Sequence, residues 1–381
     1  DDAYVKNVKI FGEDGYHTFC GYYDNFPLSM DGKKLLCQRV KNGADTRRDL
    51  TEVGLYSIEN NQFESLTMSK AWSWQQGSRL KWSDSNASLF YYNDVEGESY
   101  CTRIYDVGSK KIVRTIFPAL YDIGSNEKMG ATLNFSRLQR LRPGYGYSII
   151  SDSSEGENAP VNDGLFGVDL TNDAVVLLVS LKTLALEVDP SLKHQHYINH
   201  ISFSPDGKKI MFFHLWTENS WPGWMNRLCV YDLDKATYYT LEREKMVSHY
   251  DWVQNDCLLV TEADKRTKKV QYVIYTLDGN PKTILNQNEL IEDGHPTIAL
   301  SKNYFVSDTY PNSKFKQYIF LYDFDVKKRV NIMRLFGDPR LDREYRCDLH
   351  PKFKNGCVLV DTTFRKCSRR IVMFDLQYES R

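Results

Sequence analysis

The stretch HISFSPDGKKIMFF at residues 200–213 contains the pattern that determines the fold. A polar residue, His200, opens it, an aromatic follows at Phe203, and a Ser-Pro-Asp-Gly turn leads into an apolar strand. The stretch NFPLSMDGKKLL at 25–36 repeats this pattern, and HPKFKNG at 350–356 repeats it near the other end of the chain. Repetition at a period of tens of residues is typical of repeat architectures, so we tested the whole chain for further copies.

Four further copies complete a set of seven. They are RLKWSDS at 79–85, a degenerate copy at Asn134–Ser136 before a predicted strand at 147–150, HYDWVQN at 249–255 and HPTIALS at 295–301. Successive copies begin 46 to 66 residues apart, close to the period of a propeller blade with loop insertions. Each copy is followed by an apolar run ending in an acidic turn, such as VYDLD at 230–234, which predicts a hairpin. Each unit therefore has four short strands.

These units predict an all-β fold, a seven-bladed β-propeller with four-stranded blades, as one domain over residues 1–381. The last hairpin reaches the C-terminus without room for an outer strand. The run VKNVKI at 5–10 can supply that strand and close the ring, which leaves no long free sheet edge. A solenoid is the alternative, but polar capping repeats are missing from the sequence.

Composition narrows the classes of partner. With 49 basic and 50 acidic residues the net charge is −1, so no nucleic-acid partner is expected. The sequence has no run of 18 apolar residues, hence no expected membrane span. The first residues lack the apolar segment of a signal peptide. We expect the eight cysteines to be buried thiols. Free thiols favour a cytoplasmic location, or a periplasmic one if a leader has been removed.

The residue that opens each copy is expected at one mouth of the central channel. The openers are Asn25, Arg79, Asn134, His200, His249, His295 and His350. Four of the eight histidines share this one phase of the repeat, a pattern that chance placement does not explain. The imidazoles could hold a divalent metal, with Asp24, Asp251, Asp308 or Asp348 as ligands or supporting partners. They could instead act as general acids and bases, or simply hydrogen-bond to neighbouring backbone. His194 and His196 are expected in a solvent-exposed loop.

Loop insertions beside the openers carry arginine, glutamine, tryptophan and tyrosine. This combination suits an anionic sugar, because guanidinium groups pair with carboxylates and aromatic rings stack on sugar rings. For Trp82 and Trp252 we expect blade packing instead. No G-x-S-x-G elbow and no phosphate-binding glycine loop occurs. The residues expected to bind substrate are His17, Asp24, Trp74, Gln75, Gln76, Arg142, Asn199 and Trp216.

Seven segments of the chain can be compared with known families: HTFCGYYDNFP (17–27), WSWQQGSRLKW (72–82), NFSRLQRLRPGYGY (134–147), HYINHISFSPDGKKIMFFHLW (196–216), GHP (294–296), SDTYP (307–311) and RCDLHP (346–351). Together they resemble a bacterial propeller family associated with polysaccharide gene clusters. At a greater distance, the histidine-lined mouth resembles oligogalacturonate lyase and the ulvan lyases. The resemblance implies cleavage of a uronate-containing glycan by β-elimination, and for the first of these enzymes a histidine-rich divalent metal site.

β-Elimination needs a neutralised carboxylate, a base and an acid. A metal such as Mn or Zn on His249, His295, His350 and Asp348, or else Arg79 and Arg346, is expected to neutralise the carboxylate of an acidic oligo- or polysaccharide. The base is expected to be His200 or His214, and the acid Tyr145 or Tyr310. The alternative function is a non-catalytic propeller that binds a glycan or a protein in polysaccharide biosynthesis.

Overall fold

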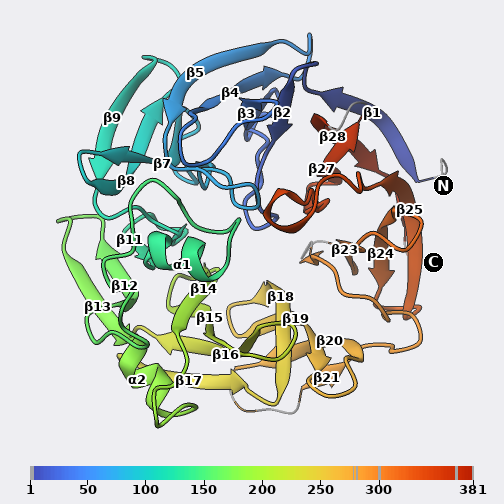
Figure 1. Cartoon of the computed structure of the whole chain (residues 1–381). Coiled ribbons are helices and arrows are strands. Elements are labelled where there is room, and N and C mark those ends of the chain that lie inside the picture. The colour runs from blue at the N-terminus through green and yellow to red at the C-terminus, as the bar shows by residue number, and fades with distance from the viewer. Residues whose placement is uncertain (1–3, 278, 280–281, 299–301, 365–367, 380–381) are drawn as a thin grey trace.

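The chain folds into seven four-stranded antiparallel sheets arranged in a ring, as the sequence predicts (Figure 1). The structure is a computed structural model that describes residues 4–277, 279, 282–298, 302–364 and 368–379. Blades are numbered here along the chain. Blade 1 contains β2 (Tyr16–Phe19), β3 (Lys34–Lys41), β4 (Thr51–Ser57) and β5 (Phe63–Ser69), and blade 2 contains β6 (Lys81–Trp82), β7 (Leu89–Glu96), β8 (Ser99–Asp106) and β9 (Lys111–Ile116).

The next four blades repeat the same order, with the first strand of each nearest the axis. Their strands are β10 (Asp122–Ile123), β11 (Met129–Thr132), β12 (Gly164–Asp169) and β13 (Val175–Ser180) in blade 3; β14 (His196–Phe203), β15 (Lys209–Thr217), β16 (Trp224–Asp232) and β17 (Thr237–Glu242) in blade 4; β18 (Lys245–Gln254), β19 (Cys257–Asp264), β20 (Val270–Thr276) and β21 (Thr283–Ile284) in blade 5; and β22 (Thr297–Ile298), β23 (Tyr304–Asp308), β24 (Lys316–Asp323) and β25 (Lys328–Phe336) in blade 6.

Blade 7 joins the two ends of the chain. Its order is β26 (Lys352–Lys354), β27 (Cys357–Phe364), β28 (Ser368–Leu376) and β1 (Val5–Phe11), so the N-terminal strand is the outer strand of the last blade. Phe11 at the end of β1 is fully buried. This confirms the predicted closure, which removes the edge that β28 would otherwise expose.

The repeated Asp-Gly turn has the same geometry in separate blades. In blade 4 the Ser204 hydroxyl donates to Asp206 and accepts from the backbone N–H of Lys209. Gly207 then has a φ of +73°, a left-handed conformation that glycine adopts without a Cβ clash. Gly32 in blade 1 has a φ of +71° in the corresponding turn. The motif is therefore a structural signal, because it ends the inner strand and starts the next.

The predicted third copy is wrong in register. The inner strand of blade 3 is β10, and the other openers precede the corresponding strand residues by two positions, so Leu120 and not Asn134 stands at the opener position. Asn134 instead caps helix α1 (Phe135–Leu141), its side chain accepting the N–H of Arg137. Residues 147–150 form bends and not a strand. The cause is an insertion of residues 133–163 between β11 and β12, which carries the polar motif that resembled an opener.

Blade 1 also departs from the template. Its inner strand is interrupted, with β2 ending at Phe19 and pairing resumed by an isolated bridge between Leu28 and Leu35. The intervening loop holds Asn25. Two further short helices, α2 (Leu181–Leu186) and the 3-10 helix η1 (Arg343–Tyr345), lie in connecting segments.

Burial within the blades agrees with most of the remaining predictions. Trp252 is buried, as expected for a packing residue, and Trp82 is half-buried. Among the described residues no helix is long and apolar enough to cross a membrane. Cys367 lies outside the described residues. The buried cysteines are Cys20, Cys37, Cys101, Cys229, Cys347 and Cys357.

Candidate functional site

Four histidines from four blades converge where the inner strands begin. The ring centroids of His249 and His295 are 4.0 Å apart, and those of His295 and His350 are 4.6 Å apart. The ring of Tyr22, from the interrupted inner strand of blade 1, stacks on His200 at 5.1 Å and meets His350 at 4.8 Å. Residues that occupy one position of the sequence repeat therefore lie close together in the fold.

Three of the openers share an unusual backbone conformation. Arg79, His200 and His350 have φ values of +54°, +57° and +45°, in the left-handed region that residues other than glycine seldom adopt. In blade 4 this residue lies within a β-bulge between Asn199 and Ser202. A bulge redirects a side chain at the end of a pairing, which here orients the opener toward the axis.

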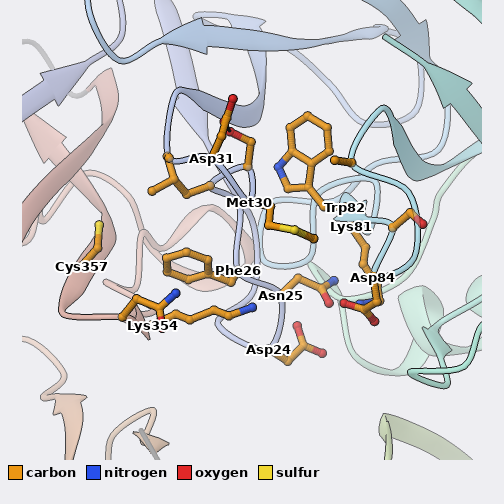
Figure 2. A pocket seen from close by; sticks show the side chains of 16 residues that line it. Asp24, Asn25, Phe26, Met30, Asp31, Lys81, Trp82, Asp84, Lys354 and Cys357 are labelled. Carbon is orange, nitrogen blue, oxygen red and sulfur yellow. Dashed lines mark hydrogen bonds and ion pairs between the residues drawn. The ribbon is translucent and has the colours of Figure 1, made fainter. Parts of the chain in front are cut away.

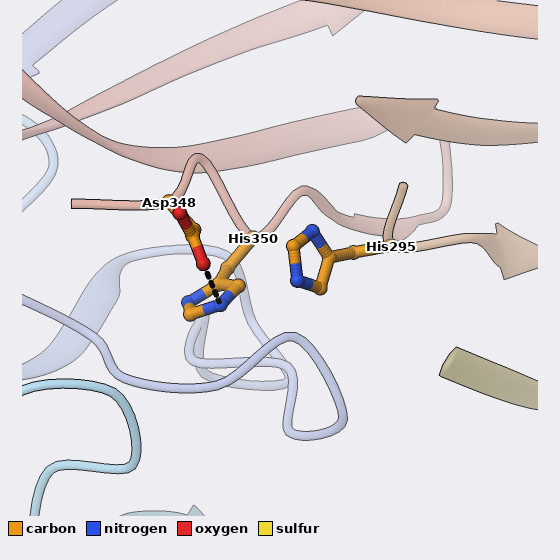
Figure 3. Close-up of side chains that lie close together, drawn as sticks. All are labelled: His295, Asp348 and His350. Carbon is orange, nitrogen blue, oxygen red and sulfur yellow. Dashed lines mark ion pairs between the residues drawn. The ribbon is translucent and has the colours of Figure 1, made fainter. Parts of the chain in front are cut away.

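His295, Asp348 and His350 form a buried triad whose potential ligand atoms all lie within 4.8 Å of one another (Figure 3). The Nε2 atoms of His295 and His350 are both buried without a hydrogen-bond partner. Buried polar atoms nearly always have a partner, so these two nitrogens beside a carboxylate are donor atoms that a metal ion could use. We call these three residues the triad.

Neighbouring carboxylate and guanidinium groups hold the triad in place. Asp308 accepts the Nδ1–H of His295 at 2.9 and 3.0 Å, which directs Nε2 toward the other two residues. Arg346 donates two hydrogen bonds to Asp348, at 2.6 and 2.8 Å. A carboxylate behind a ligating histidine is the usual supporting partner in metal sites. Asp308 thus occupies the supporting position that the sequence suggested.

The electrostatics give the triad suitable donor atoms. Burial, reinforced by His295, places the pKa of His350 well below its usual value, so its imidazole is neutral. Burial acts to raise the pKa of Asp348, but Arg346 outweighs it, and this pKa is lowered. Burial likewise opposes the charged form of His295, yet the Asp308 carboxylate raises its pKa overall. A metal that bound His295 would therefore have to displace a proton from it, because a histidine must be neutral to act as a metal ligand.

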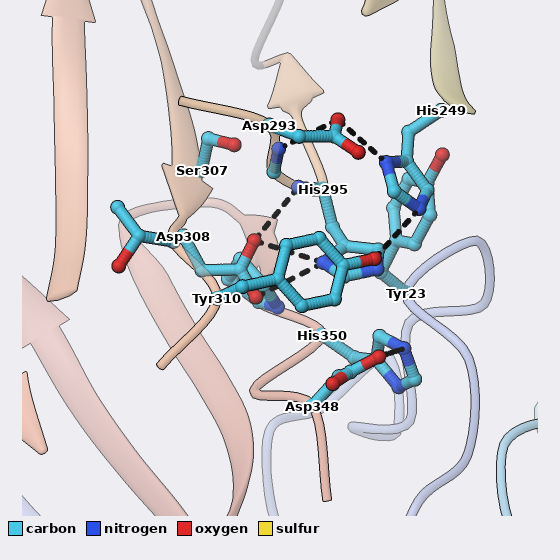
Figure 4. Close-up of polar contacts among 12 residues, drawn as sticks. Tyr23, His249, Asp293, His295, Ser307, Asp308, Tyr310, Asp348 and His350 are labelled. Atoms are coloured by element: carbon cyan, nitrogen blue, oxygen red, sulfur yellow. Dashed lines mark hydrogen bonds and ion pairs between the residues drawn. The ribbon is translucent and has the colours of Figure 1, made fainter. Parts of the chain in front are cut away.

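His249 is close to the triad but makes different contacts (Figure 4). Its Nδ1–H donates to Asp293 at 3.2 Å, and its Nε2 lies 3.5 Å from the hydroxyl of Tyr310. Burial, with the neighbouring His295, lowers its pKa. A neutral imidazole that a carboxylate orients at one nitrogen, with only a long contact to a hydroxyl at the other, is an arrangement that a general base can have. His249 was expected to be a metal ligand, and the structure gives its two ring nitrogens these other partners.

A cavity of about 80 Å³ adjoins this histidine. His200, also predicted to act at the mouth, lies on its wall. Its Nε2 is 3.2 Å from the amide nitrogen of Asn199, and burial holds its pKa well below the usual value. The lining brings together these residues of four blades: Arg142, Tyr145, Asn199, His200, Phe213, Leu215, Trp224, Asn226, Val247, Ser248, His249, Asp293 and Tyr310.

Two predicted arginines have their guanidinium groups already engaged. Arg79 forks Asp24 with two hydrogen bonds of 2.9 Å and also donates to Gln76 and to the backbone of Tyr121. Arg346 forks Asp348 as described above. Either guanidinium group would have to break its ion pair with aspartate before it could form two hydrogen bonds to a sugar carboxylate. Asp24 and Gln76 accordingly support Arg79 in this structure.

His214 and Trp216 lie on the opposite face of β15 from the cavity. Side chains alternate along a strand, and Phe213 and Leu215 are the residues of β15 that line the cavity. His214 bonds instead to His196 at 2.9 Å and to Arg227 at 3.1 Å. His196 was expected in an exposed loop, which is wrong, because it is fully buried in β14. The exposed fraction of the His194 side chain is 31%.

His17, Trp74 and Gln75 are buried in the rim around the mouth. The Nδ1 of His17 accepts the backbone N–H of Arg369, and burial lowers the pKa of His17 to about 4. Trp74 packs against Phe19 and the guanidinium of Arg369. The Gln75 amide donates to the carbonyls of Glu344 and Arg346, at 3.1 and 2.7 Å. These residues hold the loop that carries Arg346 and Asp348.

A larger cavity of about 590 Å³ opens among blades 1, 2 and 7 (Figure 2). It is lined by Asn25, Trp82 and the turn residues Asp31 and Asn355. These turns follow the inner strands, so this cavity lies at the end of the strands away from the triad. Asn25, predicted at the histidine-lined mouth, therefore lies beside this cavity.

Several mouth residues were not predicted from the repeat. Asp293 precedes the sixth opener by two residues, as Asp348 precedes the seventh, but of these two acids only Asp348 was among the predicted site residues. Tyr22 and Tyr23 come from a loop specific to blade 1, where the Tyr23 hydroxyl donates to the Tyr250 carbonyl at 2.6 Å. The segment HTFCGYYDNFP contained both tyrosines, but without the interrupted strand nothing placed them at the axis.

The fold and the buried triad define a seven-bladed β-propeller with a candidate metal centre at its axis. An oligogalacturonate lyase structure in complex with manganese superposes with a TM-score of 0.69 at 12% identity, covering 97% of this chain and 93% of that one. Oligogalacturonate lyase from Vibrio parahaemolyticus gives a TM-score of 0.66 at 13% identity, with coverages of 98% and 97%. A prolyl endopeptidase gives 0.53 at 12%, covering 96% of this chain but 49% of that one.

These similarities establish the propeller fold, which the lyases share over nearly their whole length. No family model matches the sequence. No curated protein matches it either.

Proposed function

We propose that this protein is a lyase that cleaves a uronate-containing glycan by β-elimination. The observation that carries the proposal is the position of His249, oriented by Asp293, directly beside the buried triad. Lyases of the same propeller architecture, one of them bound to manganese, support the choice of reaction.

The triad would hold a divalent metal such as Mn or Zn. Two imidazole nitrogens and one carboxylate oxygen suit either ion, and three protein ligands leave positions open for substrate. When bound, the metal would supply positive charge that neutralises a uronate carboxylate and so makes the proton on C5 more acidic.

His249 would remove that proton at Nε2, with Asp293 stabilising the resulting imidazolium. The electron pair of the C5–H bond forms the C4–C5 double bond, and the bond from C4 to the glycosidic oxygen breaks. Tyr310, whose pKa burial keeps well above its usual value, would donate a proton to the leaving oxygen. His214 is not part of this proposal, because it faces away from the cavity. Tyr145 and His200 would contact the sugar.

The test is incubation with uronate oligosaccharides in the presence of Mn²⁺ or Zn²⁺ while following the ultraviolet absorbance of the unsaturated product. We expect turnover by the native protein and a loss of about a hundredfold or more in His249→Gln, because general bases contribute on this scale. His194→Gln, outside the mouth, is the matched control.

Absence of unsaturated product across uronate substrates with both metals would refute the proposal. Tight binding of an acidic glycan without turnover would instead support a non-catalytic glycan-binding propeller.

A further inference from the structure

Arg142 has a free guanidinium beside the candidate active site. It lies over the ring of Trp224 at 4.7 Å and near that of Tyr145 at 5.6 Å, and it lines the cavity that holds His249. No carboxylate of the described residues lies within ion-pair distance of it, whereas Arg79 and Arg346 each fork an aspartate. Arg142 is half-buried, so an anion bound there would be partly shielded from water.

The backbone that carries Arg142 is firmly held. Arg142 is the C-cap of α1, with its N–H bonded to the carbonyl of Leu138 at 2.7 Å. One helical turn earlier, the buried Arg137 donates to the His196 carbonyl at 2.7 Å and to carbonyls of the blade 3 insertion. Stacking on two rings and a fixed helix end reduce the entropy that Arg142 would lose on binding a ligand.

The cavity beside Arg142 fits a carboxylate group. Its volume of about 80 Å³ has room for a small polar group such as a carboxylate. The amides of Asn199 and Asn226 line it, although Asn226 is already bonded to Val247. None of the triad residues lines this cavity. The mouth therefore offers two separate places for an anionic group, one at the triad and one at Arg142.

We propose that Arg142 binds the carboxylate of a second acidic sugar unit, adjacent to the unit at the triad, so that the site selects glycans with neighbouring uronates. The inference rests on the proposed function, since it takes the first uronate to occupy the triad. A planar guanidinium pairs with a carboxylate through two parallel hydrogen bonds, which a neutral sugar cannot provide.

The experiment measures binding by calorimetry in the full-length, Mn²⁺-loaded His249→Gln protein, which leaves the substrate intact. The probes are galacturonate, digalacturonate and the dimethyl ester of digalacturonate. Adding Arg142→Gln should weaken binding of digalacturonate by about ten- to a hundredfold, the scale of a charge-assisted pair. Binding of galacturonate and of the ester should change less than about threefold.

Arg142→Lys keeps the positive charge but cannot form the two parallel hydrogen bonds. Its affinity for digalacturonate should therefore lie between that of the parent protein and that of Arg142→Gln. Arg47→Gln, an exposed arginine elsewhere, is the matched control, and thermal unfolding checks that each variant is folded. Unchanged digalacturonate binding in Arg142→Gln, or an equal loss for galacturonate, would overturn this inference alone. Failure of the parent protein to bind any uronate probe would overturn the proposed function as well.

Discussion

At the scale of single residues, His295 and His350 each bury a ring nitrogen that has no hydrogen-bond partner, a costly arrangement unless a ligand completes it. His295 belongs to the segment before β22, while Asp348 and His350 precede β26. The carboxylate of Asp308 fixes which nitrogen of His295 faces the others. These contacts make the triad a preformed site.

We therefore expect His295→Ala to lose metal. The native protein should carry about one Mn²⁺ or Zn²⁺ per chain by elemental analysis, and the variant far less, because two protein ligands hold an ion much more weakly than three. His194→Ala removes a histidine outside the mouth and should keep the native content. Equal metal in both variants would show that the triad is not the binding site.

Part of this site could be predicted from the sequence. The shared phase identified His200, His249, His295 and His350 as neighbours, because a propeller converts a repeat position into a position around the axis. The shared phase could not distinguish the proposed metal ligands from the proposed base, since that depends on whether Asp293 or Asp308 faces a given ring. Nor could it show that Arg79 and Arg346 are paired, because their aspartates are chosen by local loop geometry.

At the scale of elements, neighbouring blades are joined by half-buried carboxylates such as Asp122. Asp122 at the start of β10 accepts the backbone N–H of Phe203 in β14 at 2.8 Å. Burial raises the pKa of Asp122 to about 6. The folded protein therefore holds a proton on Asp122 over a range of pH in which the unfolded chain, with an ordinary carboxyl pKa near 4, does not.

This difference predicts a stability that falls as pH rises from about 4 to about 6. In that range the folded state binds more protons than the unfolded state, so deprotonation favours unfolding, by about 2–3 kcal/mol in total. Asp122→Asn keeps an oxygen to accept the Phe203 N–H but cannot ionise. Denaturant unfolding across this pH range should show a shallower decline in the variant, and identical slopes would contradict the assignment.

The element that sequence analysis misplaced is also in blade 3. Asn134 followed by Phe135 and Ser136 matched the polar-then-aromatic pattern, but a polar residue before an apolar run is equally a helix N-cap. The inner strand β10 has only two residues, too short to give a periodic signal. The insertion between β11 and β12 supplies α1, together with Arg142 and Tyr145.

At the scale of the whole molecule, ring closure depends on β1 pairing with β28. Deleting residues 1–11 exposes the edge of β28 and uncovers the interior beside Phe11. We expect the midpoint of thermal unfolding to fall by about 5 °C, as a loss of about 4 kcal/mol implies for a chain of this length. Adding the peptide of residues 1–11 should recover part of the loss, whereas a truncated chain with native stability would show that closure contributes little.

The global fold was the most predictable level. Seven copies and seven hairpins specify the blade count, and the missing last strand specifies how the ends meet, so errors in single registers did not alter the architecture. The triad has one member in blade 6 and two in blade 7. An ion bound there would be a reversible cross-link between two blades, so the ion's concentration would set how readily that part of the ring opens.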